Sequence, residues 1–182
     1  EEKIIKRIIQ PTLEGLSKLG TKYKGFLYVG LMIVENEPYL IEYNVRMGDP
    51  ECQTILPRLK SDFLDILMSC CNENLSNIKV EWHEEKSLCI VLCSKGYPDK
   101  YEKKILIKNI SEVKNSNNFF LFHAGTKKID YKVYSYGGRV LNFVSLSNSF
   151  KECRNKSTEY IKKLNWQNGF FRSDIGHRVI KK

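Results

Sequence analysis

Two short apolar segments joined by a tight turn limit most strongly what this 182-residue chain can fold into. Residues 25–34 are rich in aromatic and branched aliphatic side chains, and residues 39–45 have the same character. Such runs are typical of β-strands. The Asn-Glu-Pro sequence at residues 36–38 is a turn signal between them. The segment therefore predicts an antiparallel β-hairpin.

The two faces of the second strand differ in their chemistry. Side chains alternate between the faces of a strand, so Leu40, Glu42 and Asn44 share one face. The opposite face carries only apolar or aromatic side chains, which are those of Tyr39, Ile41, Tyr43 and Val45. We expect this second face to pack against the core of the domain.

Helical patterns flank the hairpin. Residues 1–19 carry isoleucines and leucines at a mostly helical period. Pro11 falls inside this pattern, which predicts a kink or a break near Gln10. A second apolar helix follows Ser61, and we expect Ser61 to be its N-terminal cap.

A polar stretch at residues 72–77 marks a predicted border between a domain over residues 1–76 and a domain over residues 77–182. After this border, strand-like apolar runs dominate and one amphipathic helix follows them. The strands are expected at residues 86–94, 119–124 and 140–146, and the helix at residues 149–164. Short strands with one helix predict a small α+β unit.

Composition places the chain among globular proteins. Hydrophobic residues make up 42% and charged residues 28%, values that exclude a collagen-like or wholly disordered protein. No apolar run approaches the ~20 residues of a bilayer span, so we expect no membrane association. Residues 1–6 are charged and helix-like, so we expect no signal peptide. The six cysteines form no C-x-x-C pair, which favours buried free thiols in a reducing compartment over a disulfide framework or a zinc site.

Charge is divided unevenly along the chain. Residues 1–78 carry 9 basic and 11 acidic side chains, a net of −2, while residues 79–182 carry 21 basic and 10 acidic, a net of +11. A basic half suits nucleic acid, a membrane surface or phosphorylated metabolites, and equally a plain bias toward lysine. The lysines are scattered and arginine is sparse, which argues against nucleic-acid binding. A basic nucleic-acid-binding module and a non-catalytic interaction module stay open as alternatives to an enzyme.

Glu42 and Asn44 place two oxygen-bearing side chains on one strand face, with their Cα atoms ~7 Å apart. Hard cations such as Mg²⁺ prefer carboxylate, carbonyl and phosphate oxygens, so the pair is a candidate metal site against a phosphate. The alternative is a half-exposed strand whose polar side chains face water. Arg46 follows two residues later, where it either clamps a phosphoryl or carboxylate group or forms a surface salt bridge.

The loop after this strand also has the pattern of a helix start. Asp49 suits the cap, Pro50 the first helical position and Glu51 the positive end of the helix dipole. Helix capping and the helix dipole thus explain why Asp49 and Glu51 occur at these positions, without any functional role.

The run at residues 39–53, Tyr-Leu-Ile-Glu-Tyr-Asn-Val-Arg-Met-Gly-Asp-Pro-Glu-Cys-Gln, resembles the signature region of the phosphoribosylamine–glycine ligases, also called glycinamide ribonucleotide synthetases. These are ATP-grasp enzymes of purine biosynthesis. Further family-like motifs occur in the family's order at residues 25–32, 56–62, 94–98, 123–127, 137–141 and 172–176. Met47 stands where the family pattern has phenylalanine, and both side chains are large and apolar.

The resemblance implies a role for each candidate residue. Glu42 and Asn44 match the positions that hold the Mg²⁺ or Mn²⁺ bridging the ATP phosphates. Arg46 would stabilise the transferring phosphoryl group, and Leu31 and Met32 would line the adenine pocket. Contacts to substrate are implied for Asp49, Glu51, Lys127 and Arg139.

The reaction implied by the resemblance is the ATP-dependent ligation of glycine to 5-phosphoribosylamine through glycyl phosphate, in the cytoplasm. The implied fold is α+β, with the second ATP-grasp lobe, an antiparallel sheet with helices, followed by a small strand-rich C-terminal domain. Family enzymes are more than twice this length. We therefore expect the chain to be the C-terminal part of such an enzyme, inactive without the N-terminal part.

Overall fold

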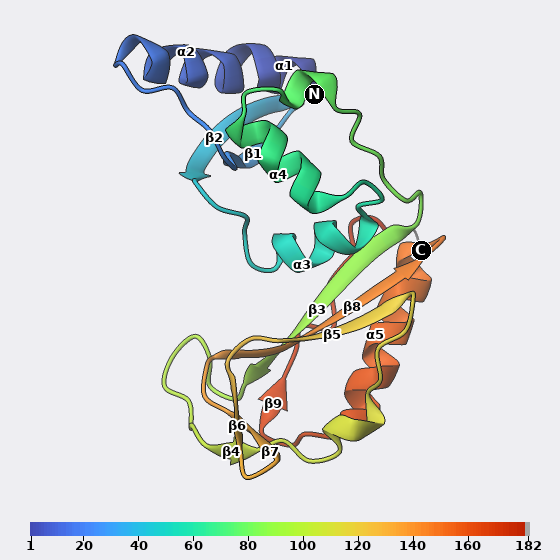
Figure 1. Ribbon diagram of the computed structural model, residues 1–182. Helices are drawn as coiled ribbons and strands as arrows, with labels where there is room; N and C mark the ends of the chain where they lie inside the picture. Colours follow the sequence, from blue (N-terminus) through green and yellow to red (C-terminus); the bar gives the residue numbers. More distant parts are fainter. Residues whose placement is uncertain (181–182) are drawn as a thin grey trace. The chain divides into compact units, whose positions relative to one another are not determined.

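The computed structural model describes residues 1–180 and divides into two compact units (Figure 1). Unit 1 comprises Glu1–Asp49 and Lys60–Glu81, and unit 2 comprises Pro50–Leu59 and the chain from Trp82 onward. This division differs from the border predicted after residue 76. The segment Pro50–Leu59 belongs to unit 2 because Leu59 forms a β-bridge with Trp82 and the amide of His83 donates to the Arg58 carbonyl at 2.8 Å.

Unit 1 contains one long N-terminal helix, a hairpin and a second helix. Its elements are α1 (Glu2–Ile4), the π-helical turn η1 (Ile5–Ile9), α2 (Gln10–Lys18), β1 (Tyr28–Val34), β2 (Glu37–Asn44), α4 (Phe63–Cys71) and the 3-10 turn η3 (Leu75–Asn77). The first three follow one another without interruption through Pro11, so of the predicted kink or break near Gln10 the break is not found. The irregularity is the π-helical turn before Pro11, and such a turn is a recognised way to relieve the i→i−4 pattern that proline interrupts.

The predicted hairpin is confirmed. Strands β1 and β2 pair antiparallel from Tyr28 opposite Asn44 to Val34 opposite Glu37. The N-terminal helix contacts this hairpin through ion pairs of Lys3 and Arg7 with Glu37. These bonds hold the pKa of the Glu37 carboxyl below its ordinary value.

The apolar face of β2 does not pack into a core, which corrects the expectation from its alternating pattern. Ile41 is 62% exposed and Val45 is 73% exposed, while Tyr39 is 58% exposed. Tyr43 on this face contacts the helix through its hydroxyl and that of Thr12. Alternation indicates which side chains share a face, but it does not supply the layer that covers them.

The start of α4 also differs from its prediction. The N-terminal cap is Asp62, whose Oδ1 accepts from the amides of Leu64 at 2.8 Å and Asp65 at 3.1 Å. Asp62 fits this place because a carboxylate also complements the positive end of the helix dipole.

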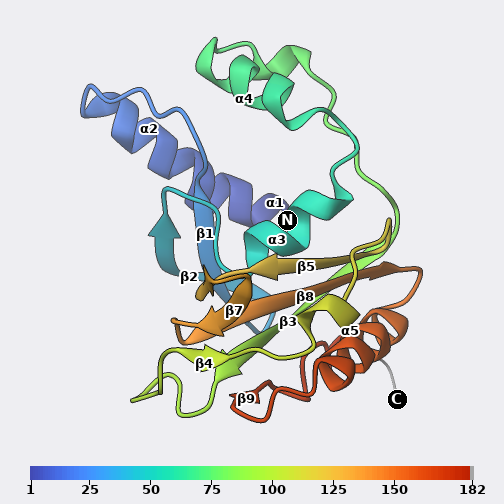
Figure 2. The same ribbon diagram turned by 60° about the horizontal axis from the view of Figure 1, so that its bottom comes forward.

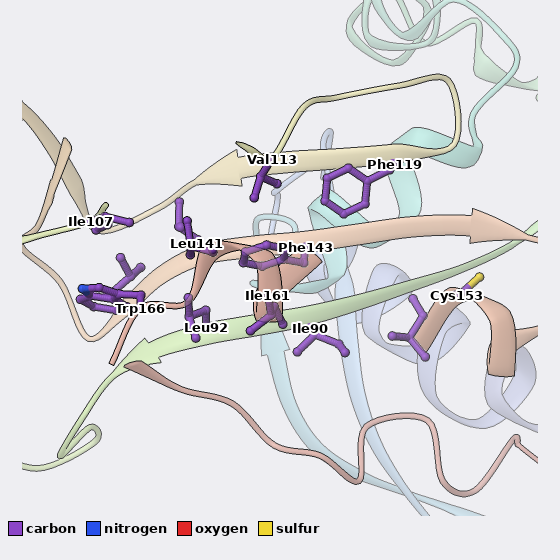
Figure 3. Packing of buried hydrophobic residues seen from close by; sticks show 13 residues of the cluster. Ile90, Leu92, Ile107, Val113, Phe119, Leu141, Phe143, Cys153, Ile161 and Trp166 are labelled. Atoms are coloured by element: carbon purple, nitrogen blue, oxygen red, sulfur yellow. The ribbon is translucent and has the colours of Figure 1, made fainter. Parts of the chain in front are cut away.

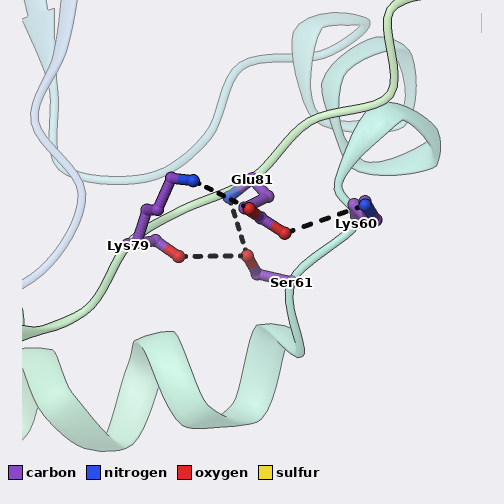
Figure 4. A network of polar contacts seen from close by, with 4 residues as sticks. All are labelled: Lys60, Ser61, Lys79 and Glu81. Atoms are coloured by element: carbon purple, nitrogen blue, oxygen red, sulfur yellow. Dashed lines mark hydrogen bonds and ion pairs between the residues drawn. The ribbon is translucent and has the colours of Figure 1, made fainter.

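Ser61 instead joins two distant segments of unit 1, as Figure 4 shows. Its hydroxyl accepts from the Glu81 amide at 2.7 Å and lies 3.4 Å from the Lys79 carbonyl. The Glu81 carboxylate lies 3.0 Å from Lys79 Nζ and 3.8 Å from Lys60 Nζ. These bonds fix where the chain enters α4 and where it leaves unit 1.

A carboxylate at the end of α4 holds the segment that precedes β1. Glu73 forms ion pairs with Lys22 and Lys24, and these hydrogen bonds lower its pKa from 4.5 to about 2. Because the folded pKa lies below the ordinary value, this stabilisation is present above pH 4.5 and is lost as the pH falls toward 2.

The titration of Glu73 can be observed directly. We expect its side-chain NMR resonances to titrate near pH 2 in the native chain. Removing both ammonium groups with Lys22→Ala and Lys24→Ala should return the midpoint toward the ordinary carboxyl value, because the hydrogen bonds that stabilise the charged form are gone. A native midpoint near 4.5 would contradict the proposed tether.

Unit 2 is built on a four-stranded antiparallel sheet with the order β5-β8-β3-β9 (Figure 2). It also contains a three-stranded antiparallel sheet with the order β4-β7-β6. Its strands are β3 (Lys86–Ser94), β4 (Ile105–Leu106), β5 (Phe119–His123), β6 (Thr126–Ile129), β7 (Lys132–Ser135), β8 (Arg139–Ser147) and β9 (Gly169–Phe170). Its helices are α3 (Glu51–Ile55), η2 (Leu56–Arg58), η4 (Ile110–Glu112) and α5 (Phe150–Leu164). The three strands and the helix predicted for the second half correspond to β3, β5, β8 and α5, and the α+β fold with antiparallel sheets is confirmed.

Helix α5 closes the main core of unit 2. Ser149 caps it by accepting from the Glu152 amide at 3.2 Å. Its buried residues recur every three or four positions, as the packing face of a helix requires, and they are Cys153, Ser157, Ile161 and Leu164. Figure 3 shows Cys153 and Ile161 of α5 in one apolar cluster with side chains of β3 and β8. Phe119 and Phe143 of the same cluster are fully buried.

Two further expectations concern membranes and cysteines. None of the helices within residues 1–180 is both long enough and apolar enough to cross a bilayer. All six cysteines are free, and among residues 1–180 no cluster of three His, Cys, Asp or Glu side chains is arranged to hold a metal. The prediction that these thiols are buried holds for Cys89 and Cys153, whereas Cys71 is exposed and the other three are half-buried.

Candidate functional site on strand β2

The side chains of Glu42 and Asn44 meet at the end of strand β2. The Asn44 amide nitrogen donates to Glu42 Oε1 at 3.0 Å. Glu42 is exposed and Asn44 is half-buried, so the pair lies at the surface of unit 1. The structure thus places both residues on one strand face, as the two-residue period predicts. The carboxylate of Glu42 and the amide oxygen of Asn44 are a suitable donor set for a hard divalent cation once the Asn44 amide turns its oxygen, in place of its nitrogen, toward Glu42.

Gly30 on the neighbouring strand makes room for the Glu42 side chain. The two residues are paired across the hairpin, and the register shifts between Gly30 and Leu31. A Cβ atom added at Gly30 would lie only 2.9 Å from Glu42 Cγ. The Glu42 side chain therefore lies over the bare backbone of Gly30. This glycine is a site determinant that the sequence pattern did not single out.

Gly30→Ala should displace the Glu42 carboxylate from Asn44, because the new methyl group would lie 2.9 Å from Glu42 Cγ, which is closer than van der Waals contact. We expect chemical-shift changes centred on these two side chains, and loss of the cross-peaks between them in an NMR spectrum. Gly15→Ala is the matched control, since nothing lies within 4 Å of a Cβ there. That control should leave the pair unchanged and stabilise helix α2 by up to about 1 kcal/mol. Unchanged Glu42–Asn44 cross-peaks in the Gly30 variant would contradict this account.

Arg46 lies in the loop just beyond β2. Its Nη1 donates to the Met47 carbonyl at 3.1 Å, and the side chain is exposed. Within residues 1–180 it forms no ion pair, so the surface salt bridge weighed as its alternative role is not found. A guanidinium group without a carboxylate partner keeps its charge available for an anionic ligand.

The expected cap of the next helix is wrong. Helix α3 begins at Glu51 with Pro50 in the cap position and no side-chain cap bond, so Asp49 does not cap it. Pro50 therefore stands one position earlier than predicted. Asp49 and Glu51 each take part in polar or electrostatic interactions of the folded chain. A substrate role for Asp49 remains a proposal.

The two residues expected at the adenine lie on β1. Leu31 is half-buried, whereas Met32 is 52% exposed. Leu40 on the adjacent strand is 43% exposed. Leu31 pairs with Leu40 and Met32 pairs with Tyr39, so Leu31 and Met32 point to opposite faces of the hairpin.

The two candidates of unit 2 lie in different surroundings. Arg139 begins β8 and lines a cavity of about 400 Å³ that Arg172 and Tyr97 also line. Lys127 lies on β6 with its Nζ 5.4 Å from the ring centroid of Tyr136, and it does not line this cavity. Arg172 forms a bidentate pair with Asp174, which raises the pKa of its guanidinium. Residues 172–176 resemble a family motif in the sequence, but only the structure shows that Arg172 and Arg139 line the same cavity.

His123 has a structural explanation. Its Nδ1 lies 2.9 Å from Thr126 Oγ1, and burial lowers the pKa of its imidazole below the ordinary value. A neutral, hydrogen-bonded imidazole at the end of β5 suits a turn that links two sheets.

Two family models match the chain. Residues 1–52 match the ATP-grasp (A) domain of phosphoribosylglycinamide synthetase, and residues 87–178 match its C domain. The Glu42–Asn44 pair and Arg46 fall in the first match, and the core of unit 2 falls in the second. The class is therefore that of ATP-grasp proteins. The chain belongs to the phosphoribosylglycinamide synthetase family.

Individual relatives agree with this assignment. The chain is 43% identical over 179 residues to a phosphoribosylamine–glycine ligase of Agrobacterium fabrum and 40% identical over 177 residues to one of Fusobacterium nucleatum. These matches cover 98% and 97% of this chain and 42% of each relative. A crystal structure of the Thermotoga maritima phosphoribosylamine–glycine ligase superposes with a TM-score of 0.76 at 33% identity, covering 96% of this chain and 44% of that one. The chain thus spans less than half the length of these relatives.

Proposed function

We propose that this chain is part of a ligase that joins glycine to 5-phosphoribosylamine with ATP, giving glycinamide ribonucleotide in purine biosynthesis. The observation that carries the proposal is the contact between Glu42 and Asn44 beside the unpaired Arg46, within a segment that matches an ATP-grasp domain. A Mg²⁺ or Mn²⁺ ion held by Glu42 and Asn44 would neutralise charge on the ATP phosphates. Because only two side chains of this chain would hold it, phosphate oxygens would supply further ligands.

The proposed reaction has two balanced steps. The glycine carboxylate oxygen attacks the γ-phosphorus of ATP, and the bond to the β-phosphate oxygen breaks to release ADP. The amine of 5-phosphoribosylamine then attacks the carbonyl carbon of glycyl phosphate, phosphate leaves, and the amine loses its proton. Arg46 would face the transferring phosphoryl group, where a fixed positive charge stabilises the transition state.

The remaining residues take supporting roles in this proposal. Apolar contacts with the adenine ring are proposed for Leu31 and Met32. Contacts with the amine substrate are proposed for Asp49 and Glu51, which follow strand β2 in the chain. Arg139 and Lys127 carry positive charge that suits the phosphate of 5-phosphoribosylamine, and Arg139 does so within a cavity. We retain a cytoplasmic location as part of the proposal, although an Arabidopsis thaliana relative, 38% identical over 182 residues, is named as chloroplastic.

A chimera tests the function. We expect that replacing the matching segment of the Fusobacterium nucleatum ligase by this chain gives ADP release that requires both glycine and freshly generated 5-phosphoribosylamine. Turnover should reach about 1 s⁻¹ or more, as for ordinary enzymes. The 182-residue chain alone should show no such turnover, because alignment by the rest of the enzyme supplies about 7–11 kcal/mol of the barrier reduction.

Two results would contradict the proposal. One is a chimera with the circular dichroism of a folded ligase that releases no substrate-dependent ADP. The other is substrate-dependent turnover of about 1 s⁻¹ by the isolated chain, which would show that the groups described here suffice.

A further inference from the structure

A second cavity of unit 2 contains polar groups that the proposed ligase reaction does not use. It has a volume of about 520 Å³, within the usual range for small-molecule sites. Its walls come from the end of β3, the loop that follows, strands β4 and β7, and the segment after α5. Ser135 and Trp166 are among the residues that line it.

Both of these residues carry a buried polar atom without a partner. Ser135 is fully buried and Trp166 is 9% exposed. Neither Ser135 Oγ nor Trp166 Nε1 has a hydrogen-bond partner among the residues that the structure describes. Figure 3 shows the Trp166 nitrogen on the side of the ring away from Leu92. A buried polar group without a partner is unfavourable, so a ligand that pairs with both atoms recovers that cost.

The walls of this cavity are fixed by backbone bonds. The Lys95 amide donates to the Asn168 carbonyl at 2.8 Å, and the Lys104 amide donates to the Ser135 carbonyl at 2.7 Å. These bonds tie the loop after β3 both to β7 and to the segment after α5. The cavity is therefore held open by the fold, while the side chains around it keep their donors for a ligand.

The donors indicate the chemistry of that ligand. The indole N–H of Trp166 only donates, and so do the ammonium groups of Lys95 and Lys100 at the cavity. Neither lysine forms an ion pair within residues 1–180. The Ser135 hydroxyl can donate as well, because its hydrogen rotates about the Cβ–Oγ bond. The carboxylate of Glu102 also lines the cavity, and its negative charge offsets one of the two positive charges. A ligand that complements these donors carries hydrogen-bond acceptors and negative charge.

We propose that this cavity binds a small oxyanion, a phosphate or carboxylate group, through Ser135, Trp166, Lys95 and Lys100. The ligand's oxygens take the place of the missing partners of Ser135 and Trp166. The lysines supply the charge that draws the anion to the cavity. This site needs neither ATP nor glycine, so its test is independent of the proposed ligase activity.

The indole N–H resonances of the whole 182-residue chain provide the test. Sodium phosphate and sodium acetate are added in separate ¹⁵N NMR titrations at constant ionic strength. We expect the Trp166 resonance, assigned by its absence in Trp166→Phe, to shift and saturate. The Trp82 resonance is the internal reference, because Trp82 does not line the cavity. The titration that saturates at lower concentration identifies the oxyanion as phosphate or carboxylate.

Variants separate a built site from a general effect of salt. Ser135→Ala should weaken binding about tenfold or more, the value of a hydrogen bond to a charged ligand. Ser87→Ala is the matched control, since it removes another buried hydroxyl without a partner, outside the cavity. It should leave the affinity unchanged. An unmoved Trp166 resonance with both anions, an equal shift of Trp82, or equal losses in the two serine variants would each overturn the proposal.

Discussion

Glu42→Gln in the ligase chimera is expected to lower turnover by about a hundredfold to a thousandfold, the usual cost of removing one group that stabilises charge in the transition state. The substitution keeps the size of the side chain and a hydrogen-bond partner for Asn44, so the hairpin should remain intact. What it removes is the negative charge that suits a divalent cation against the ATP phosphates. The measurement is the rate of substrate-dependent ADP release at saturating Mg²⁺.

Glu35→Gln is the matched control for this experiment. Glu35 is an exposed glutamate in the turn of the same hairpin, and its removal changes the net charge by the same amount. We expect the control to retain activity within twofold of the unmodified chimera, roughly the effect of a neutral surface change. If Glu42→Gln retained activity within a fewfold of the unmodified chimera, the proposal that Glu42 binds the metal would be wrong.

Phe143→Ala is expected to destabilise unit 2 by about 3–5 kcal/mol, because it deletes a fully buried ring and leaves a cavity. The ring lies at the centre of the core, 6.2 Å from that of Phe119 between centroids, and its exposure is 0%. Urea unfolding followed by tryptophan fluorescence reports on this unit, since Trp82 and Trp166 both belong to it.

Tyr131→Ala provides the comparison, because Tyr131 is an aromatic residue of the same unit that is 93% exposed. Its loss should change stability by no more than about 0.5 kcal/mol. Equal destabilisation by the two variants would show that the buried core described here does not hold unit 2 together.

The periodic elements were predictable from the sequence because each of them depends on local pattern. Helix α5 carries its buried face at helical spacing and begins at the expected Ser149. The hairpin follows from two apolar runs around a turn, and the two-residue period places Glu42 beside Asn44. These features depend on neighbours within a few residues, which the sequence displays directly.

The failed predictions depend on contacts that the sequence does not display. Asp62 rather than Ser61 caps α4 because Ser61 is engaged with Lys79 and Glu81, which follow α4 in the chain. Gly30 is part of the site only through its pairing with Glu42. In the same way, Ser135 and Trp166 are far apart in the sequence, and only the fold brings them to one cavity.

The uncovered hairpin of unit 1 has a practical consequence for handling the chain. In the described residues its sheet has two strands, so each strand has an outer edge with unpaired backbone groups. One broad side is rich in exposed aliphatic and aromatic groups, including Ile41 and Val45. Open edges with apolar sides are the surfaces on which chains stack into intermolecular sheets. When produced in isolation, this chain should therefore be kept dilute, and self-association should begin at the hairpin, while the well-packed unit 2 stays folded.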